Sequence, residues 1–432
     1  MRKGLLLLAF PLMLVVLQSS PAPAVSQTSD QQVTSLGDGV WSYFGDPRAV
    51  YANDTTFVGW VTSKGDIVVA SIRQDVVQRH TLDHVGRDDH SNPSLFIRPG
   101  GRIVAVYAPH GVGAKSQVKH MYYRVSVRPY DVTAWGPIRR MPANSAPVGG
   151  HPDRAFSYPN PIQMPNGRVW LFWRGGSWWP TVSITSDWQH WTRPRTVVTS
   201  IPGQRPYAKY AGDGKSVYMA FSRSHPMEKA TGIYFLRISK SGAEYRSDGT
   251  RIGSLNHPPS YARATPVYRY SASGGRAWPL DIALDSQHRP VVVYQRRDAH
   301  TGDTYRYAWW DGTKWVDRVL VPAGQSPTAW SYHQYYQGGV TLDHDDPSIA
   351  YVSRRPFDGS PYEIEIWTTP DHGSSWAHMA VTEGSSQDNW RPVGSRGYPG
   401  GTQVFWWRGR YATFRDYNTE ILRNLKRQAA AG

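Results

Sequence analysis

The sequence has 432 residues, no cysteine and a formal net charge of +15, and it contains 19 Trp, 26 Tyr, 40 Gly and 33 Pro. The lack of cysteine excludes disulfide bonds, a thiolate nucleophile and cysteine metal ligands, while the many aromatic and turn-forming residues favour short strands over helices. The positive charge indicates a polyanionic partner or serves solubility alone, and a nucleic acid is not expected because the basic residues are scattered and form no recognisable binding motif.

The first residues have the pattern of a secretory signal. Arg2 and Lys3 precede an apolar run over residues 4–17, and Ala22-Pro23-Ala24 provides a cleavage site of small residues. We therefore expect a signal peptide over residues 1–26, a mature chain over residues 27–432 and secretion of this chain. No later segment approaches the roughly 20 apolar residues that a membrane-spanning helix needs, so no membrane partner is expected. No oligomeric state is predicted.

A short apolar strand recurs seven times along the rest of the chain. The seven copies are TTFVGWV near Trp60, GRIVAVY near Ala105, GRVWLFW near Leu171, KSVYMAF near Met219, RPVVVY near Val293, PSIAYVS near Ala350 and TQVFWW near Phe405. Turn residues commonly precede each copy, and a further strand often follows it. This repetition predicts an all-β fold, a single seven-bladed β-propeller over residues 27–432, with six or eight blades as the alternatives.

The segment from Thr369 to Trp376 fits the Asp-box pattern S/T-x-D-x-G-x-x-W, a turn between the outer strands of a propeller blade. In this turn the aspartate side chain bonds turn amides, the glycine adopts a positive φ and the tryptophan packs between blades. Residues 185–191 form a degenerate copy. The Asp box supports the fold and indicates no chemistry. At the end of the chain, residues 418–427 are predicted to form a short helix.

Polar side chains stand before and after the repeated strands, where the loops of a propeller converge on the central axis. His90 precedes Asn-Pro at the start of the second repeat, and His110 follows its strand. Tyr158 and Arg174 occupy the equivalent places in the third repeat. The candidates of the fourth repeat are Arg205, Tyr207, Lys209 and His225. A lone histidine at a strand end is more often structural than catalytic, but equivalent places in successive repeats favour one functional site.

The stretches that carry these residues are DDHSNPSLF, YAPHG, YPNPI, LFWRGG, RPYAKY and SRSHP. They resemble the BNR-type seven-bladed propeller polysaccharide lyases, which include ulvan lyases and the L-rhamnose-α-1,4-D-glucuronate lyases that act on gum arabic and arabinogalactan side chains. The resemblance is strongest over residues 88–226 and extends to AWPLDIALD, GGVTLDHDDPS and DNWRPVG. It implies a catalytic set of His90, His110, Tyr158 and Arg174, and a linkage with L-rhamnose on O4 of a uronate. It does not identify the polymer.

The chemistry of a uronate lyase needs these side chains. Such an enzyme removes the proton on C5, next to the carboxylate, and expels the oxygen on C4, so the carboxylate must be neutralised. Arg174 suits this task because a guanidinium is permanently charged and binds a carboxylate with two hydrogen bonds, and His110 is expected to assist it. His90 is the expected base, and Tyr158 is the expected acid, its pKa lowered by nearby cations. Two alternatives stay open: exchanged roles of His90 and His110, and Tyr158 as both base and acid.

Around this set, further side chains are expected to contact an anionic, uronate-containing polysaccharide. They are Arg205, Tyr207, Lys209 and His225, with a structural metal site as the alternative role of His225. No HExxH motif, EF-hand loop or Cys/His cluster is present, and the mechanism requires no cofactor. A structural calcium or zinc ion stays open, because some members of the family that the chain resembles carry one.

Two other functions compete with a lyase. A sialidase-like hydrolase would need an arginine cluster with a Tyr/Glu pair, or two facing carboxylates, whereas acidic residues are few near the strand ends. A non-catalytic carbohydrate-binding propeller would show similar pockets in every blade, whereas these polar residues concentrate in the second to fourth repeats. Both comparisons favour the lyase.

Overall fold

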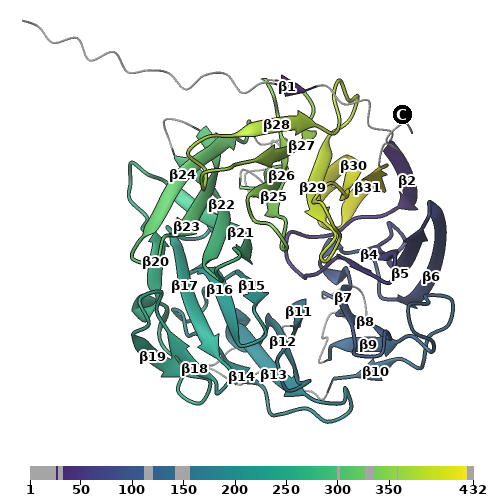
Figure 1. Ribbon diagram of the computed structural model, residues 1–432, viewed down its shortest axis with the longest axis horizontal. Coiled ribbons are helices and arrows are strands. Elements are labelled where there is room, and N and C mark those ends of the chain that lie inside the picture. The colour runs from purple at the N-terminus through teal and green to yellow at the C-terminus, as the bar shows by residue number, and fades with distance from the viewer. Residues whose placement is uncertain are drawn as a thin grey trace, which may run out of the picture.

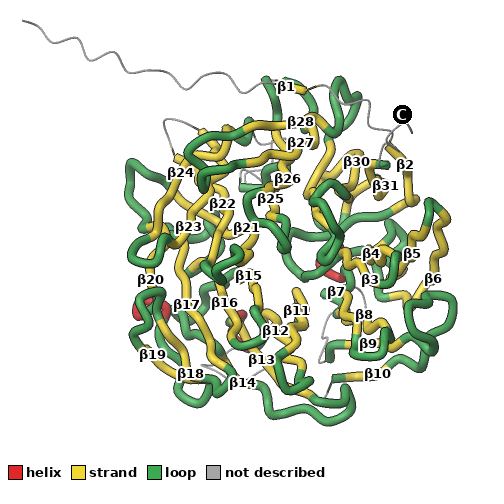
Figure 2. The backbone as a smooth tube through the Cα atoms, viewed as in Figure 1, coloured by secondary structure: helices red, strands yellow, loops and turns green. Residues whose placement is uncertain are grey.

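A computed structural model describes residues 26–27, 33–110, 120–141, 156–298, 302–325, 335–357 and 359–425. Its strands form seven sheets that surround a central axis as the blades of a ring (Figure 1), so the predicted seven-bladed propeller is confirmed. Strands and loops make up nearly all of the described chain, with short helical turns at Asp89–Ser91, Gly176–Trp178 and Tyr261–Arg263 (Figure 2). No described helix is long and apolar enough to cross a bilayer. The predicted signal peptide lies, but for residue 26, outside the described residues.

The first four blades follow the chain from the inside of the ring outward. Blade 1 contains β3 (Ala49–Ala52), β4 (Thr55–Val61), β5 (Asp66–Arg73) and β6 (Val76–His84). Blade 2 contains β7 (Ser94–Ile97), β8 (Ile103–Tyr107), β9 (Tyr122–Val125) and β10 (Arg139–Arg140). Blade 3 contains β11 (Ser157–Gln163), β12 (Val169–Arg174), β13 (Pro180–Thr185) and β14 (Arg195–Thr196). Blade 4 contains β15 (Ala208–Gly212), β16 (Ser216–Ser222), β17 (Ile233–Ser239), β18 (Ala243–Tyr245), β19 (Arg251–Ser254) and β20 (Thr265–Tyr268).

The last three blades follow the same plan and use the ends of the described chain. Blade 5 contains β21 (Arg276–Leu284), β22 (Pro290–Asp298), β23 (Gly302–Trp310) and β24 (Trp315–Pro322). Blade 6 contains β25 (Gly339–Leu342), β26 (Ile349–Arg354), β27 (Glu363–Thr368), β28 (Ala377–Ala380) and β1 (Ser26–Gln27), which pairs with β28 in parallel. Blade 7 contains β29 (Asn389–Gly394), β30 (Val404–Thr413), β31 (Asp416–Asn424) and, outermost, β2 (Val33–Asp38).

Each of the seven repeated strands is the second strand of its blade: β4, β8, β12, β16, β22, β26 and β30. Every residue of β4, β8, β12 and β16 is buried. A strand in this place is covered on both faces by the neighbouring blades, which explains its continuous apolar sequence. The sequence pattern therefore located a fully buried strand in each of blades 1 to 4.

The ring closes in blade 7, where β2 pairs antiparallel with β31. Figure 1 shows this contact between the purple start and the yellow end of the chain. The prediction of a helix over residues 418–427 is wrong for residues 418–424, which belong to β31 between β30 and β2. Residues 426–427 lie outside the described residues. In β31, Ile421 and Leu422 are buried by the neighbouring strands. Pairing with strands distant in sequence outweighs the local helix preference.

The Asp box is confirmed as the turn between β27 and β28. The side chain of Asp371 accepts a hydrogen bond from the Ser375 amide at 2.8 Å, and Gly373 has a φ of +85°. Trp376 packs edge-on against Tyr307 of blade 5, with ring centroids 5.3 Å apart. In the degenerate copy, the Asp187 side chain accepts from two turn amides. Both turns fix the outer edge of a blade.

Residues 40–47, here called the axial segment, lead from blade 7 into blade 1 across the centre of the ring. Arg391 of blade 7 donates to the Trp41 carbonyl oxygen at 2.8 Å, and Ser42 is hydrogen-bonded to Asn92 at the entry of blade 2. Lys209 of blade 4 donates to the Tyr43 carbonyl oxygen and pairs with Asp46 at 2.7 Å. Contacts with three blades place this segment at the axis, where a site assembled from several blades must lie.

Candidate active site

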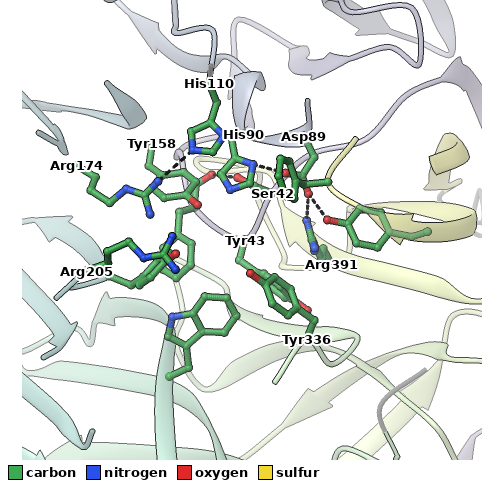
Figure 3. A pocket seen from close by; sticks show the side chains of 15 residues that line it. Ser42, Tyr43, Asp89, His90, His110, Tyr158, Arg174, Arg205, Tyr336 and Arg391 are labelled. Carbon is green, nitrogen blue, oxygen red and sulfur yellow. Dashed lines mark hydrogen bonds and ion pairs between the residues drawn. The ribbon is translucent and has the colours of Figure 1, made fainter. Parts of the chain in front are cut away.

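A cavity of about 320 Å³ opens at the axis, within the range of roughly 300–1,000 Å³ that is usual for small-molecule sites. Its lining comprises Ser42, Tyr43, Phe44, Asp89, His90, His110, Tyr158, Arg174, Arg205, Tyr207, Trp278, Tyr336, Arg391, Tyr411 and Phe414. All four predicted catalytic residues are among them, and their side chains point toward one another (Figure 3). The structure thus brings the predicted set together around one cavity.

The two histidines share one carboxylate. His90 lies in the helical turn Asp89–Ser91, which Asp88 caps, and His110 follows β8. Asp88 binds Nδ1 of His90 with one oxygen at 2.7 Å and Nδ1 of His110 with the other at 3.2 Å. The two rings are stacked with centroids 3.9 Å apart. This arrangement turns Nε2 of each ring away from Asp88, so both rings present a nitrogen on the side opposite that carboxylate.

The environment separates the protonation states of this pair. Burial by itself would lower the pKa of His90, but the carboxylates of Asp88 and Asp89 raise it to about 9. Burial and the positive charge of His90 lower the pKa of His110 to about 4. At neutral pH, His90 is therefore an imidazolium and His110 a neutral imidazole. The pair provides one cation and one base.

A second carboxylate lies beside the same nitrogen of His90. Asp89 lies 2.8 Å from Nδ1 of His90, and its other oxygen accepts from Arg391 at 2.7 Å and from the Tyr411 hydroxyl at 2.6 Å. Arg391 and Asp89 are both buried. Since Arg391 and Tyr411 hold one oxygen of Asp89, its charge remains fixed beside His90.

Arg174 ends β12 and reaches the histidines from blade 3. Its Nη2 lies 3.3 Å from Nε2 of His110, and its Nε donates to the Ser157 hydroxyl at 3.1 Å. The guanidinium lies over the Tyr158 ring, 4.7 Å from the centroid. Its buried Nη1 has no hydrogen-bond partner among the described residues. A buried donor left unpaired at the wall of a cavity is suited to a ligand oxygen.

The backbone of Tyr158 is strained, with a φ of +62° at a bulge between β11 and β12. Burial raises its pKa well above the usual value, although Arg174 acts in the opposite direction. The expectation that cations lower the pKa of Tyr158 is therefore wrong. Tyr207, with its ring centroid 6.0 Å away, has the lowered pKa instead, because Arg174, Arg205 and His90 together outweigh its burial.

The comparisons with known proteins agree with this site. The signature of the BNR repeat-containing family matches residues 55–322. This chain belongs to that family. It is 23% identical over 401 residues to an ulvan lyase of Alteromonas sp. (strain LOR), a match that spans 79% of this chain and 74% of that protein. The family PL25 ulvan lyase of Pseudoalteromonas sp. (strain PLSV) is 23% identical over 324 residues, 63% of this chain and 64% of that protein.

The fold agrees as well. A solved PL25 ulvan lyase, bound to -[GlcA(1-4)Rha3S]-, superimposes on this BNR repeat protein with a TM-score of 0.69 at 16% identity, covering 90% of this chain and 95% of that one. The expected relationship to the propeller polysaccharide lyases is thereby confirmed. The relatives also support the expectation that this BNR repeat protein is an enzyme of the polysaccharide lyase class.

Of the four predicted substrate contacts, Arg205 and Tyr207 line the cavity and the other two do not. Lys209 is 1% exposed and pairs with Asp46, so it stabilises the axial segment from outside the cavity lining. His225 is fully buried; its Nδ1 accepts from the Met227 amide at 3.1 Å, and its Nε2 lies 3.3 Å from the Tyr336 hydroxyl. Both ring nitrogens are engaged, so neither substrate binding nor a metal site is supported at His225.

Asp88, His90 and His110 form the one group of described residues whose ligand atoms lie close enough to hold a metal ion. The Asp88 oxygens already bind both histidines, and Arg415 Nε lies 3.2 Å from one of them. A cation there would be opposed by two guanidinium groups, of Arg415 and Arg174. The residues fit a hydrogen-bonded pair better than a metal site.

Several lining residues were missed by the sequence analysis: Ser42, Tyr43, Phe44, Asp89, Trp278, Tyr336, Arg391, Tyr411 and Phe414. Asp89 stands in the stretch DDHSNPSLF and Arg391 in DNWRPVG, so both were within the segments that carried the resemblance. The axial residues lie before the first repeated strand and have no local signal. Their contribution depends on the path of the chain across the ring.

Proposed function

We propose that this BNR repeat protein is an exported polysaccharide lyase that cleaves the L-rhamnose-α-1,4-D-glucuronate linkage by β-elimination. The observation that carries the proposal is a single cavity in which an imidazolium, a neutral imidazole, two phenols and a guanidinium with an unpaired donor face one another. The PL25 relative was solved with a ligand that contains glucuronate and rhamnose, which supports a substrate built of these two sugars.

The first task of the site is to neutralise the uronate carboxylate. Arg174 offers its unpaired Nη1, and the His90 imidazolium provides a second positive charge next to it. Together they offset the negative charge that develops on the carboxylate when C5 loses its proton. Fixed donors of this kind act without reorganisation during the reaction.

The second task is removal of the C5 proton. The raised pKa of His90 makes it a poor base at neutral pH, whereas His110 is neutral above about pH 4. We therefore assign the base to His110 and carboxylate neutralisation to His90, the exchange of roles that the sequence left open. When the carboxylate engages Arg174, Nε2 of His110 is released to accept the proton.

The third task is protonation of the leaving oxygen on C4. Tyr158 and Tyr207 stand beside Arg174, with its guanidinium carbon 4.7 Å and 5.2 Å from their ring centroids. Tyr158 keeps its proton because burial raises its pKa, and Tyr207 is the stronger acid of the two. One of these two tyrosines therefore donates the proton to the leaving oxygen. As the C4–oxygen bond breaks, the proton moves to the departing sugar and the unsaturated uronate remains.

Part of the cavity wall is aromatic and consists of Tyr43, Phe44, Trp278 and Tyr336. Such walls suit the apolar face of a sugar ring, and we assign them to the rhamnose side of the bond. Gum arabic, arabinogalactan-type polymers and ulvan are the candidate substrates. A hydrolase is disfavoured, because Asp89 is the sole carboxylate among the lining residues and already pairs with His90 and Arg391.

The proposal is tested by incubating the protein with gum arabic, arabinogalactan and ulvan while following ultraviolet absorbance from the new C4–C5 double bond. A lyase raises the absorbance on at least one polymer. A hydrolase releases reducing ends without it, and a carbohydrate-binding propeller gives neither signal. Replacing Tyr158→Phe and Tyr207→Phe separately identifies the acid, since its loss abolishes the absorbance in a folded protein. Full activity in both variants would remove the phenols from the mechanism.

A further inference from the structure

A second cavity, here called the rim pocket, lies between blades 1 and 7 and encloses about 240 Å³. Its lining comprises Tyr51, Asp54, Thr56, Ile72, Gln74, Asp75, Tyr398, Thr402, Gln403, Arg423 and Asn424. These residues stand at the end of the inner strand β3, the start of β4, the end of β5 and the turn after it, the loop before β30 and the end of β31. The active-site residues stand at the opposite ends of equivalent strands, such as Tyr158 at the start of β11 and Arg174 at the end of β12. The rim pocket therefore opens on the other face of the ring.

The walls of the rim pocket are fixed before any ligand arrives. Two tight hairpin turns form one side, with positive φ at Asn53 and Asp54 and again at Gln74 and Asp75. The loop before β30 forms the other side. It is joined to β3 by a hydrogen bond from the Tyr51 amide to the Arg396 carbonyl oxygen at 2.8 Å. The pocket thus spans the junction where the ring closes.

The chemistry of the lining is that of a site for hydroxyl groups. Asp54 and Asp75 offer carboxylate acceptors, while Thr402 and Gln403 add neutral polar groups. The Asn424 side chain is engaged by Val404 and Thr402 and shapes the wall. A ligand with several hydroxyls would find both donors and acceptors within one pocket.

Two further features point to a sugar. Tyr51 and Tyr398 stand edge to face with ring centroids 5.0 Å apart, which gives the pocket an aromatic wall. The Arg423 side chain is 6% exposed, its Nη2 lies 2.8 Å from Asp75, a mostly exposed carboxylate, and its buried Nε has no partner among the described residues. A buried guanidinium held on one side by a solvent-exposed partner is a directional donor toward the cavity.

We propose that the rim pocket binds an uncharged sugar unit of a polysaccharide. An anionic unit is disfavoured because two carboxylates face the pocket against one guanidinium, which is already paired with one of them. Since the pocket opens on the face opposite the active site, it holds a stretch of polymer other than the bond being cleaved. The enzyme is thereby retained on its substrate. This binding is independent of the lyase reaction.

The test is affinity electrophoresis of the full protein in gels that contain a uronate-free galactan or a uronate-free arabinan. Neither probe can be cleaved by a uronate lyase. We expect at least one of them to retard the protein and Tyr398→Ala to weaken that binding at least tenfold. Tyr270→Ala, which removes an exposed tyrosine of another blade, should leave retardation unchanged.

A folding control and a second variant keep the result decisive. Thermal melting checks that Tyr398→Ala is folded. If it is not, Asp54→Asn decides, because asparagine also tolerates a positive φ while removing the acceptor charge. Retardation by neither polymer, or equal retardation of the wild type and of both variants, would overturn the proposal. Lyase activity on a short uronate oligosaccharide should be the same in all these proteins, which separates this result from the fate of the proposed function.

Discussion

His90 and His110 have different roles because one aspartate contacts both rings and another contacts only one. Asp88 lies within 3.2 Å of both imidazoles, whereas Asp89 pairs only with His90. Because of the additional carboxylate, the pKa of His90 is raised and His90 carries the proton. The difference has a local origin, because Asp88 and Asp89 directly precede His90 in the sequence, whereas Ala108 and Pro109 precede His110.

This division predicts a broad pH profile of kcat/KM. Activity should fall below about pH 4, where His110 becomes protonated, and above about pH 9, where His90 loses its proton. Replacing Asp89→Asn removes a negative charge beside His90, lowers the pKa of His90 and should move the alkaline limb to lower pH while leaving the acid limb nearly in place. Initial rates measured across this range check the prediction. An alkaline limb that does not move would assign it to another group.

Lys209 gives a second prediction at the scale of one residue. Replacing Lys209→Met leaves the buried Asp46 with one cation fewer, and we expect the free energy of unfolding to fall by about 3 kcal/mol. Because Lys209 holds the axial segment, kcat should fall as Tyr43 and Phe44 lose their positions. Denaturant unfolding of this variant is compared with that of Lys215→Met, an exposed lysine of the same blade, expected within about 0.5 kcal/mol of wild type. Equal stability of the two variants would contradict a structural role for Lys209.

At the level of single strands, some were predicted from their local sequence pattern, whereas others form only through tertiary pairing. The seven repeated strands were found from their apolar sequence because each is buried on both faces. Strand β31 was not found in this way, because it forms by pairing with β2, nearly four hundred residues earlier in the sequence. Edge strands of a blade, such as β10 and β14, are short and have weak patterns. They could not be placed before the inner strands were known.

Glu244 in β18 leads to a prediction about how the stability of the protein depends on pH. Its side chain is fully buried, neither carboxylate oxygen has a partner among the described residues, and burial raises its pKa to about 9. The unfolded chain ionises near pH 4.5, so this group reduces native stability as the pH rises from about 4.5 to about 9. Glu244→Gln removes this titration and should stabilise the protein at pH 7 by about 3 kcal/mol. Melting temperatures from pH 5 to 9 check it, and a wild-type pH dependence retained in the variant would be the contrary result.

At the scale of the whole molecule, the ring is closed by one strand from the start of the chain. β2 contributes Leu36, which is fully buried in the apolar cluster shared with Trp60 and Trp407 of blades 1 and 7. A propeller keeps only short, protected blade edges, and β2 covers the outer side of β31 in blade 7. Loss of the contact made by β2 therefore affects both neighbouring blades and the axial segment that follows.

We predict that Leu36→Ala lowers the free energy of unfolding by about 3 kcal/mol, because it leaves a cavity at the closing contact. Val33→Ala in the same strand, at a residue 38% exposed, should change it by less than about 0.5 kcal/mol. Equilibrium unfolding in denaturant measures both. If the two substitutions had the same effect, closure by β2 would not be a major source of stability.

The sequence by itself determined the seven-bladed ring and the four polar residues around its axis. Both follow from local features: continuous apolar strands, turn residues and side chains repeated at equivalent strand ends. The tertiary structure decided that His110 shares Asp88 with His90, that Lys209 and His225 lie outside the cavity lining, and that Tyr43 and Phe44 belong to it. These outcomes depend on burial and on charges brought together from distant parts of the chain, and no local pattern encodes such distances.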